Sequence, residues 1–239
     1  MSGIIGNNIV RDGLVLNLDA ADRKSYPGSG TIWYDRSGVS KISTDTSLVT
    51  YDNNAFTATS LNQYIWFGGS NSYLQNLTND GNDHTYECWF KPLGTVPGAS
   101  NGYMFGRRGN HTGFQQSGLS IINPVIWYSD NTYQFVGNAS GNTYYIIASN
   151  VQTFVHLVLV VNETQNIALM YYNGSQLGVS TTLTKTLKAY GTAGYFLFSG
   201  SGTNYSVNGS VSMARLYNKA LSSSEVLQNF NATRKRFNI

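Results

Sequence analysis

Hydrophobic residues occur along this chain in short runs of about four to eight positions, which either alternate with polar residues or are continuous. Glycine, asparagine, serine or aspartate bounds these runs, and helical periodicity is almost absent before residue 222. Short apolar runs between turn-forming residues are typical of an all-β sandwich or barrel. The pattern predicts strands over residues 13–18, 63–68, 85–91, 102–106, 119–123, 125–128, 132–136, 143–148, 154–161, 166–172, 194–199 and 209–217.

Two of these predicted strands are especially distinctive. Strand 154–161 (FVHLVLVV) is apolar almost throughout, which predicts a central strand that is covered on both faces. Strand 166–172 leads into the pair Asn173-Gly174. This pair favours a type I′ turn, because both central residues of that turn need positive φ. A hairpin is therefore predicted with this pair at its tip.

The last segment has a helical pattern instead. Ser222 is followed three residues later by Glu225, which is the spacing of a capping box, and residues 226–230 supply an apolar face. We therefore predict one short helix over residues 223–231, packed against an edge of the sandwich and followed by a tail.

The chain shows no internal boundary between domains. No linker, repeat or low-complexity block divides it, so residues 1–239 are predicted to form a single domain. Residues 1–12 precede the first predicted strand and are expected to be an N-terminal arm. Residues 223–239 are expected to be the C-terminal helix and tail.

Composition and charge narrow the classes of function. Charged residues make up only 11% of the chain, and the net charge of +3 is too small to argue for nucleic-acid binding, which normally needs a concentrated basic patch. Cys88 is the single cysteine and is expected to be a small core residue. The N-terminus lacks the pattern of a secretory signal, and no apolar stretch approaches the length of a membrane span. We expect synthesis in a cytoplasm, no signal peptide, no membrane insertion and no nucleic-acid partner.

Three segments of the chain carry a family resemblance. They are TYECWFKP at 85–92, ETQNIALMYYNGSQLGV at 163–179 and RLYNKALSSSE at 215–225. In this order they resemble the concanavalin A-like lectin/glucanase superfamily, in its laminin-G-like branch. The resemblance implies an all-β, antiparallel two-sheet sandwich of the jelly-roll type with a short C-terminal helix. It also implies a scaffold that binds sugars and other surfaces more often than it catalyses.

The opening segment 13–38 (GLVLNLDAADRKSYPGSGTIWYDRSG) resembles laminin-G-like domains of tailed-bacteriophage surface proteins. Asp35 and Ser37 can cap their own turn through side-chain hydrogen bonds, and Trp33 is expected to pack onto the sandwich. The resemblance implies a location on a virion surface. The positions that carry it are Asp19, Tyr26, Pro27, Gly28, Trp33, Asp35, Ser37 and Gly38.

The acidic residues do not indicate catalysis. Glucanases on this fold need two carboxylates on one strand about 5.5 Å apart, whereas the three glutamates of this chain, Glu87, Glu163 and Glu225, are widely separated in sequence. Glu87 is expected to be an outward-facing strand residue. His156, within an apolar strand, is expected to be a hydrogen-bonded core histidine. We expect that the protein is not an enzyme.

A metal site is not indicated either. Asp80, Asp83 and His84 do not have the spacing of a calcium-binding loop, and a tight turn explains them equally well. Laminin-G-like domains sometimes hold a calcium ion at the rim, and the resemblance leaves such a site open. Because no residue set identifies one, we expect no metal site and no cofactor.

The strongest candidate for sugar binding is a predicted hairpin that contains Trp127, Tyr128, Asp130, Asn131 and Tyr133. Aromatic rings can stack on a sugar while carboxylate and amide groups bind its hydroxyls. The alternative, which we favour, is that Trp127 and Tyr133 pack into the sandwich while Asp130 and Asn131 form the turn.

Together these observations favour a non-enzymatic structural protein on the virion surface of a tailed phage: a capsid decoration, head-fibre or tail-fibre component. Expected partners are other virion proteins, further copies of the chain in a homo-oligomer (a trimer) and host surface glycans. Two alternatives stay open. One is a free-standing carbohydrate-binding lectin, and the other is a glycoside hydrolase-like fold without activity.

Overall fold

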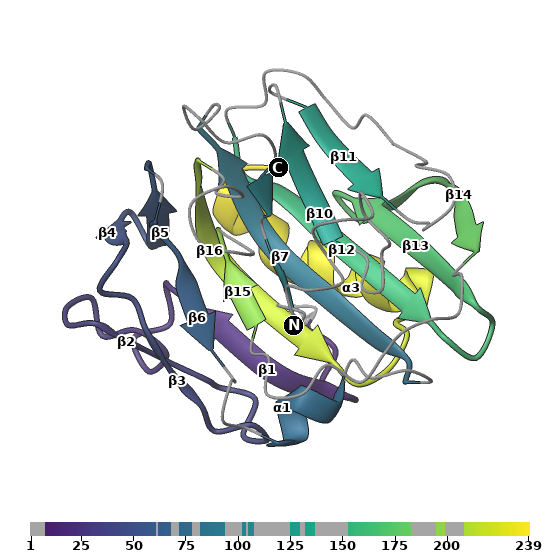
Figure 1. The fold of residues 1–239 in the computed structure, drawn as a ribbon, viewed down its shortest axis with the longest axis horizontal. Helices are drawn as coiled ribbons and strands as arrows, with labels where there is room; N and C mark the ends of the chain where they lie inside the picture. Colours follow the sequence, from purple (N-terminus) through teal and green to yellow (C-terminus); the bar gives the residue numbers. More distant parts are fainter. Residues whose placement is uncertain are drawn as a thin grey trace, which may run out of the picture.

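The computed structural model describes residues 8–60, 62–67, 72–77, 82–93, 102–103, 105–107, 125–129, 132–136, 153–182, 195–198 and 208–239. Figure 1 shows strands stacked in layers, with the C-terminal helix behind them. The strands are β1 (Leu14–Asp19), β2 (Ile32–Tyr34), β3 (Ser43–Asp45), β4 (Thr50–Asp52), β5 (Ala55–Ala58), β6 (Ile65–Phe67), β7 (His84–Pro92), β8 (Gly102–Tyr103), β9 (Phe105–Arg107), β10 (Val125–Ser129), β11 (Thr132–Val136), β12 (Val155–Asn162), β13 (Ile167–Tyr172), β14 (Ser175–Thr182), β15 (Tyr195–Leu197) and β16 (Gly209–Tyr217). The helices are α1 (Ser72–Leu77), α3 (Ser223–Thr233) and the 3-10 helix η2 (Arg234–Phe237).

The strands form two antiparallel layers. The larger sheet is eight-stranded, with the order β14-β13-β12-β7-β16-β5-β4 and with β1 also paired to β16. A five-stranded sheet, β2-β3-β6-β15-β9, forms the second layer, and a three-stranded sheet, β11-β10-β8, lies beside β9. This arrangement confirms the predicted all-β sandwich.

The main core lies between these layers and is rich in aromatic side chains. Trp33 from β2 is fully buried and packs on Phe56 with ring centroids 4.6 Å apart, which confirms that Trp33 packs onto the sandwich. Cys88 is buried in the same cluster, as predicted. From the second layer, Phe67 and Tyr195 stack at 5.8 Å.

Strand β12 is central and buried on both faces, as predicted. Its alternate residues Leu157 and Leu159 belong to the core between the layers. Val158 and Val160 point to the opposite face and pack in a second apolar cluster with Val226 of α3. A continuous apolar run is therefore explained by two buried faces rather than one.

Helix α3 lies across the outer face of the larger sheet (Figure 1), not against an edge of the sandwich as predicted from the sequence. The outer face of the larger sheet carries the apolar side chains Trp89 and Met213, and Phe230 of the helix packs on them there. The predicted capping box is present, since Ser222 and Glu225 bond reciprocally.

The predicted tail folds back onto the sheet. Helix α3 extends to Thr233, two residues beyond the predicted end, and continues as η2. Phe237 of η2 stacks on Trp89 with ring centroids 4.0 Å apart. At the other end of the chain, within the segment expected as an arm, Val10 is buried in the cluster beneath α3.

The described structure also contains elements that the sequence pattern did not predict. Strands β2 to β5 and helix α1 were all missed, whereas β14 is the second strand of the predicted hairpin. Strands β2, β3 and β4 have only three residues each, too few for an alternating pattern to stand out. The predicted strand 102–106 is divided into β8 and β9, which pair with β10 and β15 respectively.

Two local predictions have clear outcomes. The hairpin tip is confirmed, with φ of 48° at Asn173 and 80° at Gly174. The predicted strands 119–123 and 143–148 lie outside the described residues. In the part of the chain that the structure describes, no helix is long and apolar enough to cross a membrane.

Candidate functional site

A buried cluster of polar side chains lies between the larger sheet and helix α3. Its centre is Glu87 on β7, whose side chain is only 1% exposed. Alternation along β7 directs Tyr86 and Cys88 into the main core and Glu87 toward the opposite face. The sequence predicted an outward-facing Glu87. Its side chain does point away from the core between the layers, but the expected exposure to solvent is wrong, because helix α3 covers this face of the sheet.

Two cationic or polar partners hold the Glu87 carboxylate from the neighbouring strands. Arg215 of β16 pairs with Glu87 in the strand register, and its Nη1 donates to Oε1 at 2.6 Å. His156 of β12 lies diagonally across the other side, with Nε2 3.0 Å from the same oxygen. An ionised carboxylate can only accept, so His156 donates. This contact confirms the prediction of a hydrogen-bonded core histidine.

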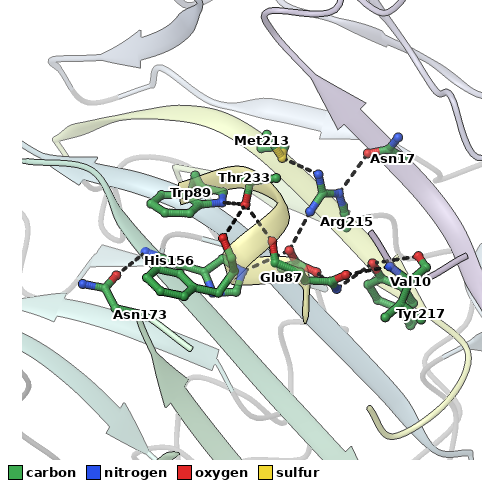
Figure 2. A network of polar contacts seen from close by, with 12 residues as sticks. Val10, Asn17, Glu87, Trp89, His156, Asn173, Met213, Arg215, Tyr217 and Thr233 are labelled. Carbon is green, nitrogen blue, oxygen red and sulfur yellow. Dashed lines mark hydrogen bonds and ion pairs between the residues drawn. The ribbon is translucent and has the colours of Figure 1, made fainter. Parts of the chain in front are cut away.

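Figure 2 shows Glu87 with Arg215 and His156 around it. Helix α3 supplies the remaining contact of this carboxylate. Asn229 donates from Nδ2 to Glu87 Oε2 at 2.7 Å and to Tyr217 Oη at 2.9 Å. Its Oδ1 accepts from the backbone N–H of Val10 at 2.8 Å. Thr233, one turn further along the helix, accepts from Trp89 Nε1 at 2.9 Å. The cluster therefore joins the helix, the N-terminal segment and three adjacent strands.

The electrostatics of this cluster favour the ionised forms of both Glu87 and Arg215. Burial alone would raise the pKa of Glu87, but Arg215 and His156 outweigh this effect and lower the pKa from 4.5 to about 2. Burial alone would lower the pKa of Arg215, whereas the facing carboxylate raises it. Burial also raises the pKa of Tyr217. Glu87 and Arg215 form an ion pair that is buried away from solvent. A buried carboxylate with both oxygens hydrogen-bonded is not placed to exchange protons with a substrate.

Sequence reasoning missed this cluster as a unit. The available signal was Arg215, a single cation in the strand sequence GSVSMARLY, all of which is buried. A cation in a buried strand needs a carboxylate partner. Which carboxylate it meets depends on strand order, because Glu87 lies 128 residues away in the chain.

The predicted sugar-binding residues fall on and around the hairpin of β10 and β11. Trp127 and Tyr128 lie on β10, Tyr133 lies on β11, and Tyr128 is the register partner of Tyr133. Asp130 and Asn131 lie outside the described residues. The hairpin backbone thus exists as predicted, while the assignment of these residues to sugar binding stays a prediction.

The turn that follows β2 has the local structure that its sequence predicted. Asp35 Oδ1 accepts from the backbone N–H of Ser37 at 2.8 Å, and its Oδ2 accepts from the Ser37 hydroxyl at 2.7 Å. Gly38 follows with a φ of 83°. For metal ions, the described residues contain no group of three or more His, Cys, Asp or Glu side chains that could hold one.

Two antiparallel layers, with a helix packed across one outer face, define a lectin-like β-sandwich. Sequence comparison agrees with this class. A laminin-G-type sequence profile of the concanavalin A-like lectin/glucanases superfamily matches residues 67–227, about two thirds of the chain. The chain belongs to that superfamily. No curated protein matches the sequence significantly.

Solved structures share the fold at low sequence identity. A Trypanosoma rangeli sialidase in complex with sialic acid superposes with a TM-score of 0.68 at 14% identity, over 94% of this chain and 33% of the sialidase. The binding domain of Paraclostridial Mosquitocidal Protein 1 gives 0.64 at 16% identity, over 93% of this chain and 52% of that one. The binding domain of Botulinum Neurotoxin DC in complex with SialylT gives 0.63 at 11%, with the same coverages. This chain thus spans about a third of the sialidase and about half of each toxin binding domain.

Proposed function

We propose that this protein is a non-catalytic binding module that serves as a structural protein on the surface of a tailed-phage virion. The observation that carries the non-catalytic part is the burial of Glu87. A glycosidase carboxylate must reach the glycosidic bond or its water. Glu87 instead lies beneath helix α3 with both oxygens bonded to Arg215, His156 and Asn229.

Other acidic side chains in the described part also serve the fold. Glu225 caps α3 and pairs with Lys219 at 2.8 Å. Asp19 pairs with Arg236 at 2.6 Å, which fastens η2 to the end of β1. Carboxylates held by neighbouring cations and N–H groups favour a role in structure over a role in acid–base chemistry. This pattern supports a module that makes contacts rather than one that cleaves a substrate.

The comparisons support a binding role, with host surface glycans as the ligands. Two of the structural neighbours are binding domains, and the complexes named above contain sialic acid or SialylT. The virion setting is supported by the resemblance of residues 13–38 to phage surface proteins. In this proposal the other partners are virion proteins and further copies of the chain, as a trimer.

The virion setting is tested by detecting the chain in purified phage particles. Mass spectrometry should find it in a fixed ratio to the major capsid protein, and cryo-electron microscopy should place it at a defined surface position. Its absence from purified particles would reject the virion setting. The alternative of a free-standing lectin would then be favoured if the isolated protein still bound glycans.

The glycan-binding part is tested separately on a glycan array. The isolated protein should bind a limited set of host surface glycans. Variants Trp127→Ala and Tyr133→Ala test the predicted hairpin site, with Tyr133→Phe as the control that keeps the ring. Unchanged binding by both alanine variants would show that glycans bind elsewhere. An array without any bound glycan would leave a purely structural virion protein.

A further inference from the structure

A surface cavity lies beside the turn that follows β2. Its volume is about 490 Å³, and small-molecule sites commonly enclose roughly 300–1,000 Å³. It lies within one short stretch of sequence, far in the chain from the predicted hairpin site. Its lining residues are Lys24, Tyr34, Asp35, Arg36, Gly38, Lys41 and Ile42.

Asp35, the acidic residue in this lining, is held by hydrogen bonds from neighbouring residues. Asp35 Oδ1 accepts from the backbone N–H of Asn17 as well as that of Ser37, each at 2.8 Å. Its Oδ2 accepts from the hydroxyls of Ser37 and Ser40 and from the backbone N–H of Lys41, at 2.7, 2.8 and 3.1 Å. Five hydrogen bonds therefore hold the carboxylate in the cavity wall and occupy both of its oxygens.

The three cations of the lining are exposed and largely without partners. Among the described residues, the ammonium groups of Lys24 and Lys41 make no hydrogen bond or ion pair. Arg36 has one acidic neighbour, with Nε 3.7 Å from Asp22 Oδ2, which is too long for a hydrogen bond. The terminal nitrogens of its guanidinium group remain available to a ligand. Asp35 in the lining and Asp22 beside Arg36 offset part of this charge, so the cavity presents a smaller net positive charge to solvent.

The cavity is also lined by an exposed aromatic ring, that of Tyr34, and by the accessible backbone of Gly38. Tyr34 is 46% exposed, so its ring is accessible to a ligand from solvent. Gly38, at a φ of 83°, has nothing within 4 Å of the place where a Cβ would be, so a ligand can approach the backbone there. Exposed rings stack on the C–H faces of pyranoses, while a planar guanidinium pairs with a carboxylate through two hydrogen bonds.

We infer that this cavity binds a sugar that carries a carboxylate. Arg36 pairs with the carboxylate, Lys24 and Lys41 add positive charge, and Tyr34 stacks on the sugar ring. A neutral sugar would make no use of the net positive charge of this lining, and a simple anion would leave the exposed ring unused. The inference rests on the proposed binding function and gives it a ligand class and a second location on the molecule.

Isothermal titration with monosaccharides tests the ligand class. Glucuronic acid and N-acetylneuraminic acid should both bind the purified full chain, and added NaCl should weaken them because exposed charge pairs are screened. Glucose and the methyl ester of glucuronic acid, which lack the charge, should bind at least about tenfold more weakly. Glucose 6-sulfate distinguishes a carboxylate site from a general anion site, since equal binding of the sulfate would overturn the carboxylate assignment.

Substitutions test the location. Arg36→Ala should weaken both acids at least about tenfold, while Arg36→Lys should recover only part of the loss because it cannot pair bidentately. Tyr34→Ala should weaken them and Tyr34→Phe should not. Lys235→Ala, which removes an exposed cation elsewhere, is the matched control and should change nothing. Thermal unfolding of each variant confirms that it is folded.

The outcomes separate this inference from the proposed function. Binding of carboxylated sugars that survives Arg36→Ala and Tyr34→Ala would overturn the location while leaving a glycan-binding module. A wild-type protein that binds neutral glycans on an array but neither acid would overturn the ligand class. Failure to find the chain in virions would reject the virion setting and leave the cavity assignment untouched.

Discussion

Replacing Glu87 by glutamine should destabilise the protein by about 3 kcal/mol at neutral pH. Glutamine keeps the shape of the side chain but removes the charge that faces Arg215, which is itself only 3% exposed. Removal of one partner from a buried ion pair costs about 3–5 kcal/mol. The lowered pKa of Glu87 agrees with this range, because a fall from 4.5 to about 2 corresponds to about 3 kcal/mol.

Urea unfolding measures this loss directly. At an m-value of about 2–3 kcal/mol/M, the transition midpoint of Glu87→Gln should fall by roughly 1 M or more with little change in slope. Asp12→Asn is the matched control, since it removes an ion pair with Lys219 in which Asp12 is 82% exposed. Such exposed pairs contribute about 1 kcal/mol or less. The double variant Glu87→Leu with Arg215→Met should recover part of the loss, because no unpaired charge stays buried while His156 and Asn229 still lose their acceptor.

The same substitution should change the pH dependence of stability. The pKa of Glu87 is lower in the folded protein than in the unfolded chain. Its contribution is therefore present above about pH 4.5 and is lost as the pH falls toward 2. The difference in unfolding free energy between wild type and Glu87→Gln should shrink over this range.

Two results would refute the reasoning about Glu87. One is a loss below about 1 kcal/mol at neutral pH, which would mean that the ion pair is not buried as the structure places it. The other is a polysaccharide-cleaving activity that disappears in Glu87→Gln while stability stays unchanged. That result would make Glu87 a catalytic residue.

Three further predictions concern the helix cap, the thiol and the hairpin. Ser222→Ala should cost about 1 kcal/mol in urea unfolding, because it removes the cap of α3, while the neighbouring Ser223→Ala should cost much less. Burial raises the pKa of the Cys88 thiol, so Ellman's reagent should react with it only at the rate of unfolding. Gly174→Ala should cost more than Gly38→Ala, because both have positive φ but only at Gly174 would the new Cβ lie 2.8 Å from a ring of α3.

Each of these has a clear contrary result. Equal losses for Ser222→Ala and Ser223→Ala would show that the cap does not hold the helix. Rapid labelling of Cys88 in the native protein would show that β7 is open to solvent. Equal costs for Gly174→Ala and Gly38→Ala would show that α3 does not press on the hairpin tip.

Local patterns predicted the elements that are long, regular or built around special turn residues. The apolar run at 154–161 predicted a doubly covered strand, and Asn173-Gly174 predicted a turn whose φ values are positive. Such signals depend on neighbours in sequence, so they can be recognised without the fold. Three-residue strands such as β2 carry too few positions for a period, and they form because neighbouring strands are available to pair.

The sequence by itself therefore determined the fold class, the hairpin tip and the capped final helix. Only the tertiary structure decided where that helix lies and what it covers. Its position turns Glu87 from an expected surface residue into half of a buried ion pair. The burial of Glu87 could not be deduced from local pattern, because its partners come from strands that only the sheet order brings together. Burial, not residue type, determines whether a carboxylate is free to react.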